Sequence, residues 1–218
     1  MTPRAALLAL LLSSTPAAAQ ICTGDAPFTD RQLRLVTDVL FNRTIEAYNA
    51  GLLFGGKGAF VGAETGLTTY NGYMADAFTL TGTAGIQGSL GAEKRAQLCP
   101  VIIAGFAFGP NDIDSTHQDY SEIDISVELD AGFIAARGKD VQVIPTASLT
   151  FGNALAKYSW ANGGGYTDAE SFGILAFGFG VILSNHATLK PSVAFPFGVK
   201  GASVTYAIRF AVKLAGWQ

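Results

Sequence analysis

Charged residues are scarce in this chain of 218 residues. Only 14% are Asp, Glu, Lys or Arg, against about a quarter in an ordinary soluble domain. The 14 basic residues do not outnumber the 17 acidic ones, so the chain offers no basic field for nucleic acid, and that class of partner is excluded. The chain has only two histidines and two cysteines, which leaves few candidates for a nucleophile–base pair.

Long hydrophobic runs are also absent. Beyond residue 20, no stretch approaches the roughly 18 uncharged apolar residues of a transmembrane helix. Yet 49% of the chain is hydrophobic, and it contains 26 glycines. A chain this apolar, without a membrane-spanning helix, forms either a large soluble core or a membrane β-barrel, and its periodicity decides between them.

The first 19 residues have the pattern of a secretory signal peptide. Arg4 supplies the positive start, residues 5–12 are apolar, and residues 17–19 are the small residues of a cleavage site. Export exposes the mature chain to an oxidising compartment, where Cys22 and Cys99 can form a disulfide. In the chain-entropy model this bond contributes about 4 kcal/mol to stability. The alternative is two unpaired buried thiols.

From residue 58 onward, polar and apolar residues alternate with a period of two, which predicts β-strands with two different faces. In 121–133, acids and serine occupy one face, and Ile, Val, Leu and Phe occupy the other. The predicted strands are 58–68, 77–91, 97–109, 121–133, 140–152, 170–184, 187–197 and 203–214. Short connections (92–96, 138–139, 185–186) alternate with longer ones (110–119, 153–169), as in outer-membrane barrels.

The chemistry of the two faces indicates which of them is inside. Bulky apolar residues dominate one face, whereas the other is rich in Gly, Ala, Ser and Thr, which suits a narrow lumen. We therefore predict apolar side chains toward lipid and a lumen that is a packed polar plug. The predicted lumenal charge network consists of Glu64, Glu122, Asp124, Glu128, Asp130, Lys190, Arg209 and Lys213. If the first and last strands are neighbours, Glu64 and Arg209 lie at similar depth and should be in contact.

The strand sequences resemble those of the small eight-stranded Gram-negative outer-membrane proteins, the porin-like β-barrel domain family. Residues 62–67 (GAETGL) look like a first strand of that family, and 204–210 (VTYAIRF) look like its closing strand. The chain departs from the family at its end, because Gln218 is last and Trp217 is out of phase. The resemblance implies insertion by the barrel-assembly machinery, but it constrains function little, because members have many roles.

The segment before the first predicted strand has a different pattern. Thr29 and Gln32 could form a capping box, and Leu33, Val36 and Leu40 begin a loose apolar stripe. We predict an amphipathic helix over 30–49. The predicted organisation is a signal peptide (1–19), a partly helical periplasmic segment (20–56) and a transmembrane barrel of eight antiparallel up-and-down strands (57–218).

One acidic loop is a candidate metal site. Asp112, Asp114, His117 and Asp119 could supply ligands to a divalent cation, although the pattern of a calcium loop is missing and a solvated loop is the simpler interpretation. His117 and His186 have no evident nucleophile beside them, so we expect no enzyme and no cofactor.

The sequence as a whole predicts a monomeric outer-membrane protein with a structural or surface-interaction role. Its expected partners are membrane lipid and lipopolysaccharide, and the barrel-assembly machinery during insertion. Three alternatives remain: a secreted lipocalin-like barrel binding a small apolar ligand, a lipid A-modifying barrel enzyme, and a passive pore.

Overall fold

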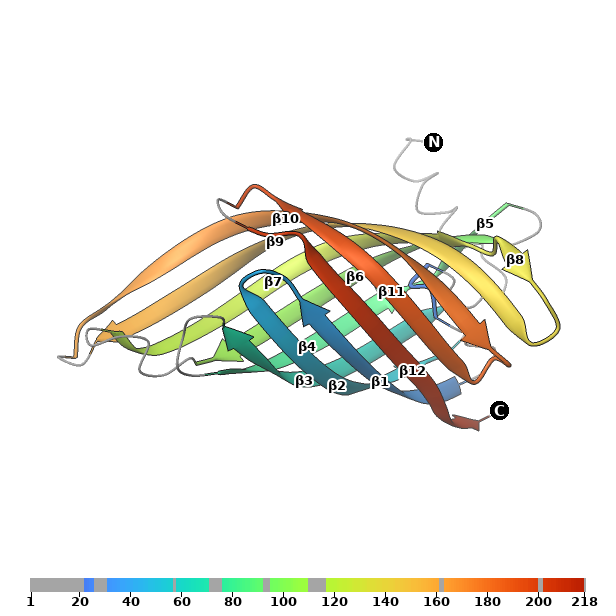
Figure 1. Ribbon diagram of the computed structural model, residues 1–218, viewed down its shortest axis with the longest axis horizontal. Helices are drawn as coiled ribbons and strands as arrows, with labels where there is room; N and C mark the ends of the chain where they lie inside the picture. The colour runs from blue at the N-terminus through green and yellow to red at the C-terminus, as the bar shows by residue number, and fades with distance from the viewer. Residues whose placement is uncertain are drawn as a thin grey trace, which may run out of the picture.

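The computed structural model describes residues 22–25, 31–56, 58–70, 76–91, 95–109, 117–160, 163–199 and 202–217. The predicted signal peptide lies outside these residues. Ten long strands form a closed antiparallel barrel (Figure 1). They are β1 (Arg31–Phe41), β2 (Ile45–Gly55), β3 (Ala59–Tyr70), β4 (Ala77–Ile86), β6 (Ala96–Phe108), β7 (His117–Phe133), β9 (Val141–Trp160), β10 (Gly165–Leu183), β11 (Ala187–Phe197) and β12 (Thr205–Trp217).

Each long strand pairs with its neighbours in the chain, and β12 pairs with β1 to close the barrel. Two short strands extend this pattern: β5 (Gly88–Leu90) continues β4 along β6, and β8 (Ala136–Arg137) continues β7 along β9. The all-β, up-and-down architecture is confirmed, but the predicted number of eight strands is wrong. Among the described residues, no helix is long and apolar enough to cross a membrane.

The two additional strands are the segment that was expected to be a helix. Residues 31–41 form β1, and β2 begins at Ile45, so the barrel starts at Arg31 and not near residue 57. The alternation is clear in β1: Gln32, Arg34, Val36 and Asp38 are buried, whereas Leu35 is exposed. The helical stripe combined Leu33 and Val36, which lie on opposite faces of the strand. Pairing with β12 and β2 decides this segment's conformation, which local sequence left ambiguous.

Apolar side chains cover the outside of the barrel, as the sequence predicted. Every long strand contributes at least one large exposed apolar residue. Ten of them, one from each strand in chain order, are Leu35, Leu52, Val61, Leu80, Ile102, Ile125, Phe151, Phe177, Leu189 and Ile208. The positions that alternate with these face the lumen and include buried Ser126, Thr150 and Thr188.

The two ends of the barrel differ. At one end, here called the terminal end, β1 begins, β12 ends and the turn 184–186 is short. At the other, the distal end, β7, β9 and β10 run far beyond the rest (Figure 1). The loop expected at 153–169 is largely absent, because β9 continues to Trp160 and β10 starts at Gly165. We call residues 117–122, 154–160 and 165–171 of β7, β9 and β10 the blade; residues 165–171 are exposed on both faces.

Candidate functional site

The N-terminal turn, residues 22–25, lies inside the lumen near the terminal end. Cys22 forms a disulfide with Cys99 of β6, and both residues are fully buried. The predicted disulfide is therefore confirmed. Cys99 can reach the turn because it alternates with exposed Pro100 and so faces inward, as do buried Gln97 and Val101. The bond closes a loop with a sequence separation of 77 residues.

An apolar cluster surrounds this disulfide on one wall of the lumen. Val36 of β1, Leu53 of β2 and Phe60 of β3 pack with Cys22, together with Val101 of β6 and Ala211 of β12. These are the largest concentration of buried apolar side chains among the described residues of the lumen. The cluster fixes one end of the turn to the wall formed by β12, β1, β2, β3 and β6.

The other end of the turn is seated on a glycine of the opposite wall. Gly24 has a positive φ of 76°, and its carbonyl oxygen lies against Gly180 of β10 so closely that a Cβ on Gly180 would be 1.7 Å away. Thr146 of β9 and Lys190 of β11 also lie beside Gly24. Only a residue without a side chain at position 180 leaves room for this backbone contact.

Asp25 completes the turn and is 2% exposed. Its Oδ2 accepts a hydrogen bond from the Thr23 hydroxyl at 3.3 Å, and its charge attracts Arg34 of β1 and Arg209 of β12. Among the described residues, its Oδ1 has no hydrogen-bond partner, and Asp25 is part of the lining of the lumenal cavity. The turn therefore brings a buried negative charge into the barrel.

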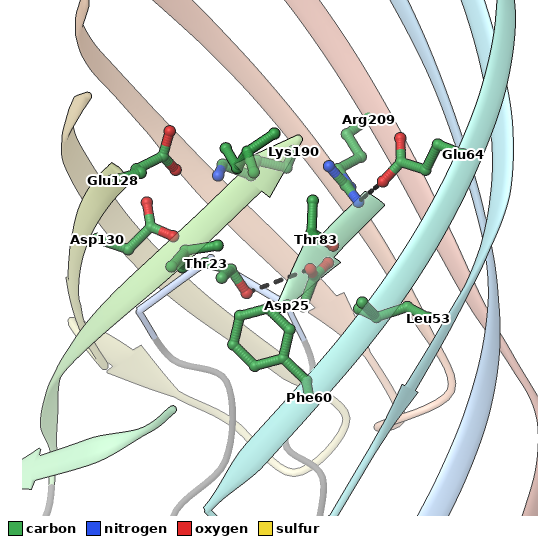
Figure 2. Close-up of a pocket in the computed structure, with 12 residues that line it drawn as sticks. Thr23, Asp25, Leu53, Phe60, Glu64, Thr83, Glu128, Asp130, Lys190 and Arg209 are labelled. Carbon is green, nitrogen blue, oxygen red and sulfur yellow. Dashed lines mark hydrogen bonds and ion pairs between the residues drawn. The ribbon is translucent and has the colours of Figure 1, made fainter. Parts of the chain in front are cut away.

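A charge cluster on the β12–β1–β2–β3 wall contains the predicted Glu64–Arg209 contact. Arg209 Nη2 donates to Glu64 Oε1 at 2.7 Å (Figure 2). The reason given for this contact was wrong, because β3 and β12 are not neighbours and β1 and β2 lie between them. Glu64 reaches over β2 because Gly51 beneath it has no side chain; a Cβ there would be 2.6 Å from the Glu64 Cγ.

Two residues between the partners complete this cluster. Asp38 of β1 is the direct register partner of Arg209 and attracts its guanidinium. Asn49 of β2 donates to Asp38 Oδ1 at 2.7 Å and lies over Gly66 of β3, where a Cβ would be 1.8 Å from Asn49 Oδ1. The arc from Arg209 to Glu64 therefore holds two hydrogen-bonded pairs, Arg209–Glu64 and Asn49–Asp38.

A second charge cluster occupies the β7–β9–β10–β11 wall. Glu128 accepts a hydrogen bond from Thr150 at 2.6 Å, and Asp130 is 5% exposed. Lys190 extends over Gly178 of β10 and attracts Asp130; Figure 2 shows its amine turned toward Glu128. The strands β10 and β9 lie between Lys190 and these acids. As for Glu64, a glycine beneath the side chain lets Lys190 extend across the neighbouring strand.

A cavity of about 120 Å³ lies between the two clusters and the turn. Its charged lining is Asp25, Glu64, Glu128, Asp130, Lys190 and Arg209. Thr23 and Thr83 add hydroxyls, and Phe60 and Val101 add an apolar floor. A polar space of this size has room for about four water molecules. The interior of the barrel is hydrophilic here and is not filled by protein.

The other predicted lumenal charges do not reach this cavity. Glu122 and Asp124 lie nearer the distal end of β7, with Glu122 accepting from the Tyr120 hydroxyl and Asp124 lying over Gly105. Glu122 is about 20 Å along the strand from Glu128. Lys213 of β12 lies nearer the terminal end, opposite Arg34. The expected single network is therefore two clusters with separate outlying charges.

The candidate metal loop falls mostly outside the described residues. Asp112, Asp114 and the side chain of His117 lie outside them, and Asp119 is exposed at the start of β7. Within the described part of the chain, no group of three or more His, Cys, Asp or Glu residues could hold a metal ion.

Sequence reasoning missed three charged groups of the lumen, Asp25, Arg34 and Asp38. Arg34 and Asp38 share the inward face of β1 with Gln32 and Val36, so a period of two at 31–41 could have found them. Asp25 follows no periodic pattern, because its place depends on the disulfide three residues before it.

Comparisons with known proteins give limited similarity. No family model matches the chain, and no curated protein matches it. Among solved structures, the chain is similar to the translocator domain of autotransporter NalP from Neisseria meningitidis, with a TM-score of 0.46, 13% identity, and coverage of 84% of this chain and 87% of that chain. A mutant of Rh. blastica porin gives a TM-score of 0.15 and 10% identity, over 85% of this chain and 99% of that chain.

Proposed function

We propose that this chain is an integral outer-membrane β-barrel whose lumen is closed and whose role is structural or surface-interacting. The observation that carries the proposal is the exposed apolar exterior, which extends over all ten long strands. Ile125 is 60% exposed and Ile102 is 59% exposed. In water, a contiguous apolar surface of this extent would drive aggregation, whereas lipid tails are as apolar as these side chains and can cover them.

The polar interior argues against the lipocalin-like alternative. A soluble barrel that binds an apolar ligand needs apolar residues inside and polar residues outside. Here the cavity is lined by four carboxylates and two basic side chains, and the outside is apolar. Closure by strand pairing also leaves the backbone groups of the spanning strands satisfied within lipid.

The terminal end would face the periplasm and the distal end the cell exterior, as the short turns at the terminal end favour. The blade would then project from the cell surface. Tyr158 and Tyr166 stack on its lumenal face with ring centroids 4.6 Å apart, and Tyr120 and Trp160 extend this aromatic row. Tyr and Trp are frequent at binding surfaces because they combine apolar area with a polar group.

Lipopolysaccharide and membrane lipid are the partners we propose for the assembled monomer. The barrel-assembly machinery would be its partner during insertion. The blade is the surface for which an interaction role is proposed, because its strands extend beyond the length that a membrane needs: β9 has 20 residues, against about 9–11 for a tilted spanning strand.

Cell fractionation tests this proposal. The protein should remain in the membrane pellet after high-salt and alkaline washing, dissolve in detergent, and migrate faster in SDS without boiling than after boiling. Recovery from the soluble periplasmic fraction, without a boiling-dependent shift, would refute membrane insertion. In that case the apolar exterior would have to be covered by protein.

A further inference from the structure

We propose that the turn 22–25 is a plug that closes a cation-selective pathway through the barrel, and that cations are conducted when this turn leaves its seat. This activity goes beyond the structural role proposed above. The closed form described here is its resting state.

The position of the turn is the first argument. The turn contacts much of the circumference: Cys22 is bonded to β6, Gly24 lies against β9, β10 and β11, and Asp25 interacts with β12 and β1. Four residues therefore cross the lumen from one wall to the other. Figure 2 shows Thr23 and Asp25 in the interior, between the walls that carry Glu128 and Glu64.

The attachment of the turn is the second argument. Its covalent link to the wall is the disulfide, and the backbone of Gly24 lies close against Gly180 of the opposite wall. Neither contact is part of the strand pairing that forms the barrel. Release of the turn therefore leaves every strand pair in place.

The space beside the turn is the third argument. The cavity of about 120 Å³ lies against Thr23 and Asp25 and is bordered by charged groups. A barrel whose interior served only as a packed plug, polar or apolar, would leave no such space there. Thr23 and Asp25 are part of the cavity lining, so removal of the turn would enlarge the polar space.

The sign of the lumenal charge is the fourth argument. The described lumenal wall carries Asp38, Glu64, Glu122, Asp124, Glu128 and Asp130 against Arg34, Lys190, Arg209 and Lys213. Carboxylates exceed basic groups by two, without counting Asp25. Excess Asp and Glu side chains along a pore favour cations over anions.

The test displaces the turn and reports its position in the same molecule. In the variant Cys99→Ser/Gly180→Ala, the tether is lost and the new Cβ would lie 1.7 Å from the Gly24 carbonyl oxygen. Cys22 remains as a reporter, because its thiol is inaccessible while the turn is seated. The matched control is Cys99→Ser/Gly82→Ala, where the nearest atom to the new Cβ is 4.0 Å away.

Three measurements are made on each protein: the boiling-dependent shift in SDS, labelling of Cys22 by a membrane-impermeant maleimide, and conductance in planar bilayers with KCl. Wild type should show no channel events. The Cys99→Ser/Gly180→Ala variant should be labelled at least tenfold faster than its control and should conduct. Across a KCl gradient, the sign of its reversal potential should show that K⁺ passes more readily than Cl⁻. Within that variant, Glu128→Gln/Asp130→Asn should reduce the preference for K⁺ over Cl⁻.

Two results would overturn the proposal. Rapid labelling without conductance would show that the turn is not what closes the lumen. Slow labelling in a folded Gly180→Ala variant would show that the disulfide and the glycine seat do not hold the turn. If that variant fails to fold, the variant Cys22→Ser/Gly24→Val replaces it, because both substitutions lie in the turn itself. Valine is strained at the φ of 76° and so disfavours the seated turn. Cys99 then serves as the labelled thiol, and the same outcomes decide.

Discussion

Replacing Arg209 with methionine would leave Glu64 and Asp38 in the lumen without the cation that pairs with Glu64 and attracts Asp38. Arg209 donates to Glu64 at 2.7 Å, with 30% of the Arg209 side chain and 14% of the Glu64 side chain exposed. Removing one partner of a fully buried pair costs about 3–5 kcal/mol. Because this pair is partly hydrated, we expect Arg209→Met to lower the free energy of unfolding by about 2–3 kcal/mol, less than for a fully buried pair.

Glu64→Gln should be much milder, at about 1 kcal/mol. Glutamine can still accept a hydrogen bond from Arg209, and Asp38 still balances the guanidinium. The double variant Arg209→Met/Glu64→Gln should be more stable than Arg209→Met alone, since it removes one of the two opposed carboxylates. The difference in stability between the double variant and Arg209→Met therefore measures how strongly the Glu64 and Asp38 carboxylates repel each other when Arg209 is absent.

Urea titration of the protein inserted in phospholipid vesicles measures these differences, with the boiling-dependent gel shift as the readout of folding. Equal losses in the two single variants, or a double variant no more stable than Arg209→Met, would refute the reasoning. That outcome would mean that water screens the lumenal charges from one another.

Three further predictions use the same assay. Gly66→Ala should lower the free energy of unfolding by about 1–2 kcal/mol, because its Cβ would displace Asn49 from Asp38. The control Gly82→Ala should not lower it, and equal losses in the two variants would contradict this role of Gly66. Cys22→Ser/Cys99→Ser should lower stability by up to about 4 kcal/mol, and the wild-type protein should match it once reduced. Ile125 is 60% exposed in the isolated chain, so Ile125→Arg would be harmless in water. In vesicles it should lower the free energy of unfolding by about 2–4 kcal/mol, because the charge would face lipid. No loss of stability in vesicles would argue against a lipid-facing exterior.

The sequence predicted eight of the ten long strands because most of them have chemically different faces, whereas 97–109 and 170–184 are apolar on both faces and left their inward side open. In β7, acids alternate with Ile, Val and Leu over many residues, and no helix could separate them. In β1, Arg34 and Asp38 are four residues apart, a spacing that fits one face of a helix as well as one face of a strand. The choice between them is made by hydrogen bonds to β12, which lies at the other end of the chain.

The candidate site was predictable in its composition but not in its connections. The parity of Glu64, Glu128, Lys190 and Arg209 placed them inside, and depth along the barrel brought Glu64 and Arg209 together. The contact forms although two unforeseen strands separate the partners, because Gly51 lets the Glu64 carboxylate reach over β2. The turn 22–25 could not be placed from the sequence, since its position depends on a bond and a glycine seat from distant strands.

The blade has a consequence for self-association. A closed barrel has no edges, but the last described pairing of β10 with β11 is at Gly173, so residues 167–170 of β10 have β9 on one side only among the described strands. Such an edge is a template for strand addition by a second copy of the chain. Asp168 and Glu170 stand along it, and two copies aligned there would place like charges together, which disfavours this pairing.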